Sequence, residues 1–200
     1  MSLTTPQTLL DKICAGGDDE AWDRFYAFYA PLIVGFCLQK GCSRATADDV
    51  LQETMVSLLR QMRGFVYDPS RGHFRSYLLK IVHRQAIKAW HRQERNVSVE
   101  EDDGGNWLAN AADSQADMPG LDWDALFDQR LLASALALVQ ERVSPIVYTS
   151  FELSVIQELP ISEVMARLGI PNANAVYQHR NRVMRYLCEA VDDLRREMDL

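Results

Sequence analysis

The chain has 200 residues, 48% of them hydrophobic and 24% charged, with a net charge of −7. This composition excludes wholesale disorder and is enough for one large or two small packed domains, of which we expect the latter. The N-terminus lacks the basic and apolar regions of a secretory signal, and no window approaches the roughly 18 apolar residues that span a membrane. We therefore expect a cytoplasmic protein without a membrane partner.

Nearly every periodic segment has helical spacing, and no alternating run with hairpin turn chemistry indicates a sheet. The sequence therefore predicts an all-α protein. The first three predicted helices cover residues 6–15, 19–40 with a break before Pro31, and 47–62. Thr46 and Asp49 form a start to the third helix that resembles a capping box.

This third helix has two distinct sides. The first is an apolar stripe of Leu51, Met55, Leu58, Leu59 and Met62. The second is a neighbouring side of Asp49, Gln52, Glu53 and Val56. Such a side suits a basic partner, although a solvated acidic face explains the same pattern.

Positive charge is concentrated in residues 60–95, which hold nine Lys/Arg and two acidic residues. Lys80, Arg84, Lys88 and Arg92 share one helical face, and Leu78, Ile81, Val82, Ala86 and Ala89 fall on another. The interleaved aromatic residues are Phe65, Tyr67, Phe74, Tyr77 and Trp90. The cations can neutralise phosphates, and the rings beside them can stack on bases. This combination suits separated DNA strands. An amphipathic helix with a solvated basic face and core rings explains the pattern equally well.

Residues 96–128 hold nine acidic residues and no Lys/Arg, and several glycines and a proline interrupt any periodicity. We expect a flexible acidic linker here. It either competes with DNA for the preceding basic helix or serves only as a soluble tether.

The C-terminal part predicts further helices at 123–142 and from Ser144 to about residue 157. Residues 160–191 have the shape of a helix-turn-helix, with a turn at Gly169 and a second helix capped near Asn172. That helix has an apolar side of Val176, Val183 and Leu187. Its other side carries groups suited to base edges or phosphates: Asn174, Tyr177, Gln178, Arg180, Asn181, Arg182 and Arg185.

The sequence carries no recognisable catalytic or metal-binding motif. Cys14, Cys37, Cys42 and Cys188 form no CxxC pair, so we expect buried free thiols rather than a metal site or a disulfide framework. The four histidines show no ligand spacing, and no nucleophile, zinc or nucleotide-binding signature is present. We expect neither an enzyme nor a cofactor, metal or small-molecule substrate.

The order of these segments resembles the small sigma factors of the extracytoplasmic-function (ECF) group, within the sigma-70 family of bacterial transcription initiation factors. DDVLQETMVSL is similar to the helix that binds the clamp of core RNA polymerase, which implies this role for Asp49, Gln52 and Glu53. YDPSRGHFRSYLLKIVHRQAIKAWHR resembles the segment that melts and reads the minus-ten promoter element. The residues to which this likeness assigns that role are Arg75, Tyr77, Lys80, Arg84, Lys88 and Trp90.

LPISEVMARLGIPNANAVYQHRNRVMRYL is similar to the family's C-terminal helix-turn-helix, which reads the minus-35 element. The implied DNA-binding residues are Asn174, Tyr177, Gln178, Asn181, Arg182 and Arg185. Family patterns often have small residues, Lys or Arg where this chain has Asn174, Tyr177 and His179. The base preference of the family therefore does not carry over.

The resemblance implies a sigma domain at 1–95, an acidic linker at 96–122 and a second sigma domain at 123–200. Core RNA polymerase and promoter DNA are the implied partners, and an anti-sigma factor is a further candidate, because one commonly holds this group inactive. The alternative is a free-standing helix-turn-helix regulator that binds operator DNA without polymerase. A helical scaffold would explain the packing faces but not the segregation of charge.

Overall fold

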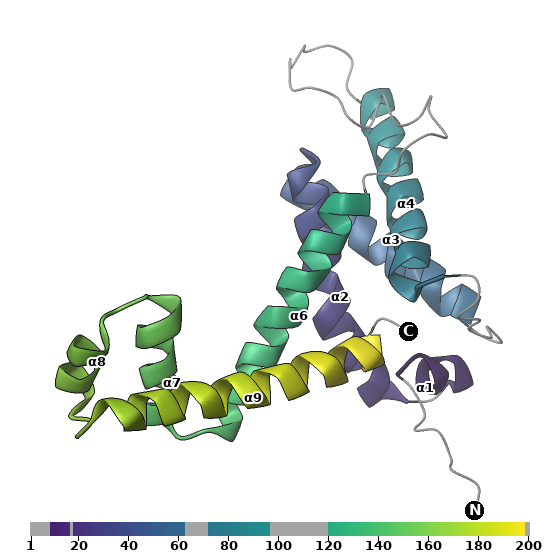
Figure 1. Ribbon diagram of the computed structural model, residues 1–200. Helices are drawn as coiled ribbons and strands as arrows, with labels where there is room; N and C mark the ends of the chain where they lie inside the picture. The colour runs from purple at the N-terminus through teal and green to yellow at the C-terminus, as the bar shows by residue number, and fades with distance from the viewer. Residues whose placement is uncertain (1–8, 17, 63–71, 97–119, 199–200) are drawn as a thin grey trace, which may run out of the picture. The chain divides into compact units, whose positions relative to one another are not determined.

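The computed structural model describes residues 9–16, 18–62, 72–96 and 120–198 (Figure 1). Over these ranges all regular structure is helical and no strand occurs, which confirms the all-α prediction. The described residues form two units. The first unit contains the described residues up to Arg130, together with Glu197 and Met198. The second unit contains Leu131–Arg196. Most of the predicted linker lies outside the described residues, and the predicted domain boundaries stay predictions.

The first unit contains four helices and the opening of a fifth. They are α1 (Leu9–Ala15), α2 (Asp19–Gln39), α3 (Arg44–Met62), α4 (Phe74–Asn96) and the beginning of α6 (Gly120–Arg142). The helix α3 packs against both α2 and α4, and it runs beside α4 in Figure 1. Residues spaced three or four apart on α3 and α4 supply the buried apolar faces, as the periodicity predicted. No described helix is long and apolar enough to span a bilayer.

Aromatic side chains form the centre of this unit. The rings of Phe25 and Tyr29 on α2 lie 5.8 and 6.0 Å from Phe74 of α4. Phe28 lies 5.5 Å from Phe127 of α6, and these five side chains are at most 3% exposed. These three contacts between helices are edge-to-face, the arrangement that ring quadrupoles favour. Phe74 is therefore a core residue and does not offer its ring to a DNA base.

Contrary to the prediction, α2 continues through Pro31 without a break. Proline has no backbone N–H, so the carbonyl of Ala27 loses its usual helical donor. Arg130 of α6 supplies the replacement: its Nη2 donates to Ala27 O at 2.7 Å and its Nε to Phe28 O at 3.3 Å. The same guanidinium lies 6.0 Å from the centre of the Phe28 ring. A side chain from a distant helix thus fills the gap that the proline leaves.

Two predictions about α3 were also wrong in detail. The helix begins at Arg44, and Ser43 rather than Thr46 is its cap, because Ser43 Oγ accepts a hydrogen bond from the Thr46 N–H at 3.1 Å. Leu59 does not belong to the buried stripe, since it is 49% exposed. The four other residues of that stripe are buried. Periodicity alone could not separate Leu59 from them, because a position at the edge of a stripe is decided by what packs there.

The second unit contains the remainder of α6, α7 (Pro145–Phe151), a π-helical turn η2 (Glu152–Ile156), α8 (Ile161–Leu168) and most of α9 (Ala173–Met198). A small core of Leu153, Val164, Ile170 and Val176 joins η2, α8 and α9. Gly169 ends α8 in the left-handed conformation, with a φ of 64°, which glycine adopts without steric cost. Asn172 Oδ1 accepts from the Ala175 N–H at 2.9 Å, which confirms the predicted cap of α9.

A double-mutant cycle tests whether Arg130 replaces the hydrogen-bond donor that Pro31 lacks. Arg130→Met should lower the free energy of unfolding by about 1 kcal/mol, the usual net contribution of a hydrogen bond. In a Pro31→Ala background the restored N–H can bond to Ala27 O, so the same substitution should cost clearly less. Urea unfolding of the four proteins measures both costs. Equal costs in the two backgrounds would show that Arg130 does not compensate for the proline.

Candidate nucleic-acid interface

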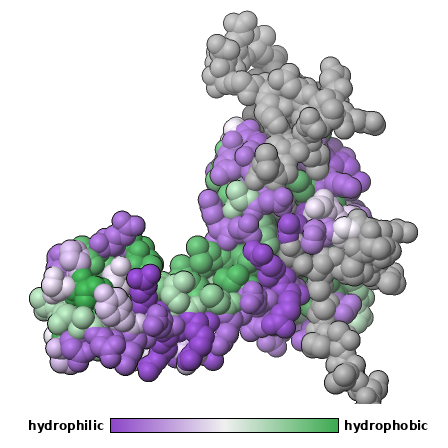
Figure 2. Space-filling model, in the orientation of Figure 1, coloured by the Kyte–Doolittle hydropathy of each residue, from purple (hydrophilic) through white to green (hydrophobic). Residues whose placement is uncertain are grey.

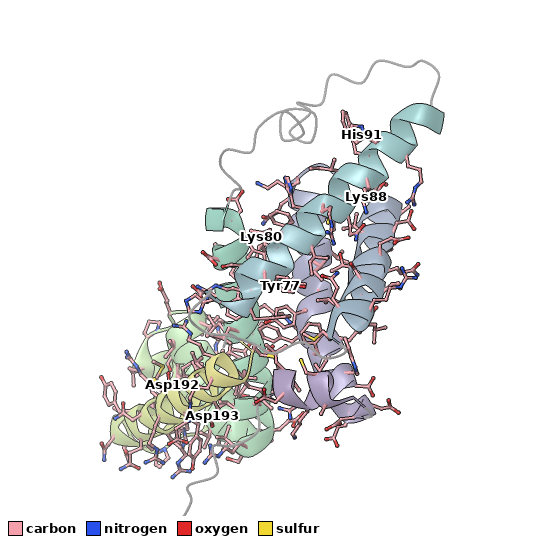
Figure 3. All side chains as sticks on the ribbon, turned by 90° about the vertical axis from the view of Figure 1, so that its right-hand side faces the viewer. Tyr77, Lys80, Lys88, His91, Asp192 and Asp193 are labelled. Carbon is pink, nitrogen blue, oxygen red and sulfur yellow. The ribbon has the colours of Figure 1, made fainter. Side chains whose placement is uncertain are left out.

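The helix α4 presents a row of cations to solvent. Lys80, Arg84, Lys88 and Arg92 are all exposed, and we call them the basic face of α4. Figure 3 shows Lys80 and Lys88 along this helix, together with Tyr77 and His91. The opposite side is buried in the first unit, with Leu78, Ile81 and Val82 at most 3% exposed. A step of four residues advances about 6 Å, so the cations extend over about 18 Å of helix.

Lysine and arginine, rather than histidine, supply this charge at neutral pH. His83 lies on the same helix, half-buried, and its burial lowers its pKa. It is therefore neutral at pH 7, because the ordinary histidine pKa of about 6.5 already lies below that pH. His83 consequently adds no positive charge to this helix at pH 7.

Two aromatic residues of α4 are half-buried, so that packing holds them while part of each ring stays accessible. The Tyr77 hydroxyl donates to Gln61 Oε1 of α3 at 2.8 Å. Burial raises the pKa of Tyr77, which nearby Arg84 partly opposes, and the phenol therefore stays neutral as a donor. The Trp90 ring lies 4.9 Å from the His91 ring. Both predicted rings thus lie on the same helix as the basic face.

Arg75 lies in a different environment from the basic face. Its Nε donates to Asp124 Oδ1 of α6 at 2.8 Å, and its guanidinium lies 5.3 Å from the centre of the Phe127 ring. Its backbone carbonyl accepts from Trp123 Nε1 at 3.1 Å, and its side chain is 23% exposed. A DNA contact by Arg75 would require this ion pair to open. The sequence carried no signal of this pairing, because the acid lies on a distant helix.

The helix α3 presents the predicted acidic side to solvent. Asp49, Gln52 and Glu53 are exposed, and Val56 and Leu59 beside them are 40% and 49% exposed. We call these five residues the outer face of α3. The neighbouring Asp48 is already paired within the helix, because its carboxylate lies 3.1 Å from Arg44 Nε. Carboxylates next to exposed apolar side chains suit a protein partner more than a nucleic acid.

In the second unit, α9 has a buried apolar side and an exposed polar side, as the sequence predicted. Val176 and Val183 are fully buried and Leu187 is nearly so. All six predicted DNA-binding residues are exposed and form the outer face of α9: Asn174, Tyr177, Gln178, Asn181, Arg182 and Arg185. The hydrophilic colouring along this helix is visible in Figure 2. Amides, a phenol and guanidinium groups are the side chains that hydrogen-bond to base edges and phosphates.

His179 lies between these two sides of α9. Its Nδ1 is buried and has no hydrogen-bond partner among the described residues. Burial lowers its pKa and the charge of Arg182 lowers it further. The imidazole is therefore neutral at pH 7 and adds no positive charge to the outer face of α9.

Residues 25–96 match the family model of sigma-70 region 2. The matched segment begins within α2 and ends with the last residue of α4, so it contains both the outer face of α3 and the basic face of α4. This match supports a transcription initiation factor of the sigma-70 family that binds RNA polymerase and takes part in promoter recognition. A search of curated proteins found no match to the chain.

Proposed function

We propose that the chain is an alternative sigma factor of the ECF group. It binds core RNA polymerase through the outer face of α3, opens the minus-ten element with α4 and reads the minus-35 element with α9. The observation that carries the proposal is the sigma-70 region 2 match, because the matched residues contain both helices that expose these first two faces. An anti-sigma partner belongs to the proposal by the same resemblance.

The outer face of α3 has the chemistry of a docking surface. A basic partner would pair with Asp49 and Glu53, and this complementarity favours both the rate and the orientation of association. Burial of the exposed parts of Val56 and Leu59 would add a hydrophobic contribution at roughly 25 cal/mol per Å². Because the buried stripe of α3 is held by α2 and α4, the helix offers this surface as a rigid element.

The basic face of α4 and its two aromatic residues fit separated strands better than a closed duplex. Opening a base step costs about 1 to 2 kcal/mol of stacking. Stacking of a free base on an aromatic ring returns about 1 to 3 kcal/mol, so Tyr77 and Trp90 could offset one or two steps. Lys80, Arg84 and their neighbours would hold the phosphates of the same strand.

In the second unit, α8, the turn at Gly169 and α9 are proposed to act as a helix-turn-helix. The small core around Val164 and Val176 fixes the two helices to each other, so the outer face of α9 is presented as one surface. A recognition helix needs such a rigid presentation, because three or four side chains must reach base edges together. Asn174, Gln178 and Arg185 are the proposed base-reading residues.

The charge of the chain explains why these faces would act on polymerase rather than alone. A net charge of −7 opposes nonspecific binding to DNA, whose affinity comes mainly from phosphate neutralisation. Two weak DNA-binding faces on one chain reinforce each other through effective concentration when the spacing of the promoter elements suits them. The exposed polar side of α9 is also consistent with a free-standing regulator, which would instead bind an operator duplex tightly by itself.

Run-off transcription with purified bacterial core polymerase and a pool of promoter fragments tests the proposal. A sigma factor would direct new start sites and would be captured by the core enzyme. Specific binding to a duplex without polymerase, combined with no capture and no new start sites, would favour the free-standing regulator.

Asp49→Arg should weaken capture by core polymerase at least about tenfold, or 1.4 kcal/mol, because it replaces an attractive contact with a repulsive one. Pull-down titration measures this change. The matched control is Asp23→Arg, which makes the same charge change at an exposed position of α2. Equal capture of the two variants would remove Asp49 from the interface.

Lys80→Ala combined with Arg84→Ala should reduce promoter opening while capture by core polymerase stays unchanged. If each cation neutralises one phosphate of a single strand, the slope of log affinity against log salt should fall by about 1.4. Permanganate reactivity of the promoter bubble measures opening. The control, Arg195→Ala with Arg196→Ala, removes the same charge from exposed positions near the end of α9 and should leave the bubble intact.

Arg185→Ala and Arg180→Ala should weaken DNA binding in two different ways. The first should cost about 1 to 3 kcal/mol on the preferred minus-35 sequence and relax the preference at one base position. The second, at a residue proposed to hold a phosphate, should weaken binding similarly for all sequences. Binding of the polymerase complex to promoters substituted base by base separates the two patterns. A uniform loss for Arg185→Ala would show that this residue does not read a base.

A further inference from the structure

Two cysteines that the proposed function does not use meet at the end of α2. Cys37 lies in the last turn of the helix and is 1% exposed, while the half-buried Cys42 follows the helix. Gly41 between them has a φ of 82°, and its N–H donates to Leu38 O at 3.0 Å. The Cys42 N–H donates to Cys37 O, also at 3.0 Å.

These two hydrogen bonds define a Schellman motif. In this motif the residue after the left-handed glycine folds back against the last turn of the helix, which here sets Cys42 against Cys37. The backbone of the turn therefore brings the two cysteines together, as a disulfide requires. A hydrogen-bonding interaction between the two thiols shifts the pKa of both. A spacing of five residues is not a CxxC motif, so sequence inspection did not select this pair.

The two thiols differ in reactivity. Their hydrogen bond lowers the pKa of Cys42, against the effect of its burial. The same hydrogen bond raises the pKa of Cys37, and burial and the negative charge of Cys42 raise it further. Cys42 is thus the more accessible and more readily ionised thiol, and the thiolate is the form that reacts with peroxide. Cys37 stays protonated beside it as the second partner.

We propose that Cys37 and Cys42 form a reversible intramolecular disulfide when the protein is exposed to hydrogen peroxide. The Cys42 thiolate attacks one peroxide oxygen, so that an S–O bond forms, the O–O bond breaks and hydroxide leaves. The Cys37 sulfur then attacks the Cys42 sulfenic acid, which forms the S–S bond and breaks the S–O bond. The Cys37 proton leaves with the departing hydroxide as water. Peroxide is reduced by two electrons, and a dithiol reductant reverses the change.

The position of the pair connects it to the packing of the first unit. Lys40 lies between the two cysteines, forms an ion pair with Asp122 of α6 and lies 5.7 Å from the centre of the Phe36 ring. Phe36 in turn packs edge-to-face on Trp123 at 5.3 Å. A disulfide would lock the turn that carries Lys40, at the point where the opening of α6 is attached to α2.

Trypsin offers a direct test, because it cleaves after Lys40, between the two cysteines. The full-length protein is treated with hydrogen peroxide, its remaining thiols are blocked with N-ethylmaleimide, and the digest is examined by mass spectrometry. We expect peptides 25–40 and 41–44 to remain joined with the loss of two hydrogen atoms. Dithiothreitol added before the blocking step should separate them.

Cys14→Ser with Cys188→Ser is the matched control and should retain the joined peptides, whereas Cys42→Ser should lose them. Circular dichroism checks that each variant is folded. The digest of the wild-type protein shows whether the disulfide forms, independently of the variants. The proposal is overturned if peptides 25–40 and 41–44 from the oxidised wild-type protein separate with both cysteines blocked. Conversion of Cys42 to a sulfinic acid with Cys37 still reduced would also overturn it.

Discussion

The aromatic packing of α2 determines how the rest of the first unit presents its surfaces. Phe25 and Tyr29 bury Phe74 at the beginning of α4, and this contact sets the rotation of that helix. With Leu78 and Val82 turned into the core, the four cations at four-residue spacing must point outward. The basic face is thus a consequence of core packing. Because its charges contribute little to the stability of the fold, binding a ligand through them would cost the fold little.

The arginines of the first unit serve two different purposes. Those of the basic face, such as Arg84, are exposed and available to a partner, while Arg75 and Arg130 bind groups of the protein itself. Arg130 substitutes for a donor that Pro31 lacks, and Arg75 pairs with an acid of α6. Both contacts attach the opening of α6 to α2 and α4. A guanidinium suits this use because its several donors can reach more than one acceptor from a fixed position.

The charge distribution and the sigma-70 region 2 match support one functional picture. An acidic chain with a confined basic face gains little from nonspecific contact with DNA, and in the proposed function the partner would bring DNA to it. The outer face of α3, where carboxylates and apolar side chains adjoin, is suited to that partner. In the proposed function, neighbouring helices of the matched segment would divide protein binding from DNA binding.

The sequence by itself determined the helical class, the basic and outer faces of α4 and α3, and the polar side of α9. Each depends on residues within a few turns of one helix, where a period of 3.6 residues decides which side chains share a face. Twelve of the fifteen predicted site residues are exposed on these faces. The other three show the limit of the pattern: Arg75, Tyr77 and Trp90 of α4 are half-buried, and Arg75 is also paired with Asp124.

 

What only the tertiary structure decided is what lies against each helix. The ion pair of Arg75 and the hydrogen bonds that Arg130 makes beside Pro31 depend on α6, and the burial of Phe74 depends on Phe25 and Tyr29 of α2. In each case the partner is distant in the sequence. Periodicity describes one helix at a time and carries no information about the partner that packs on it.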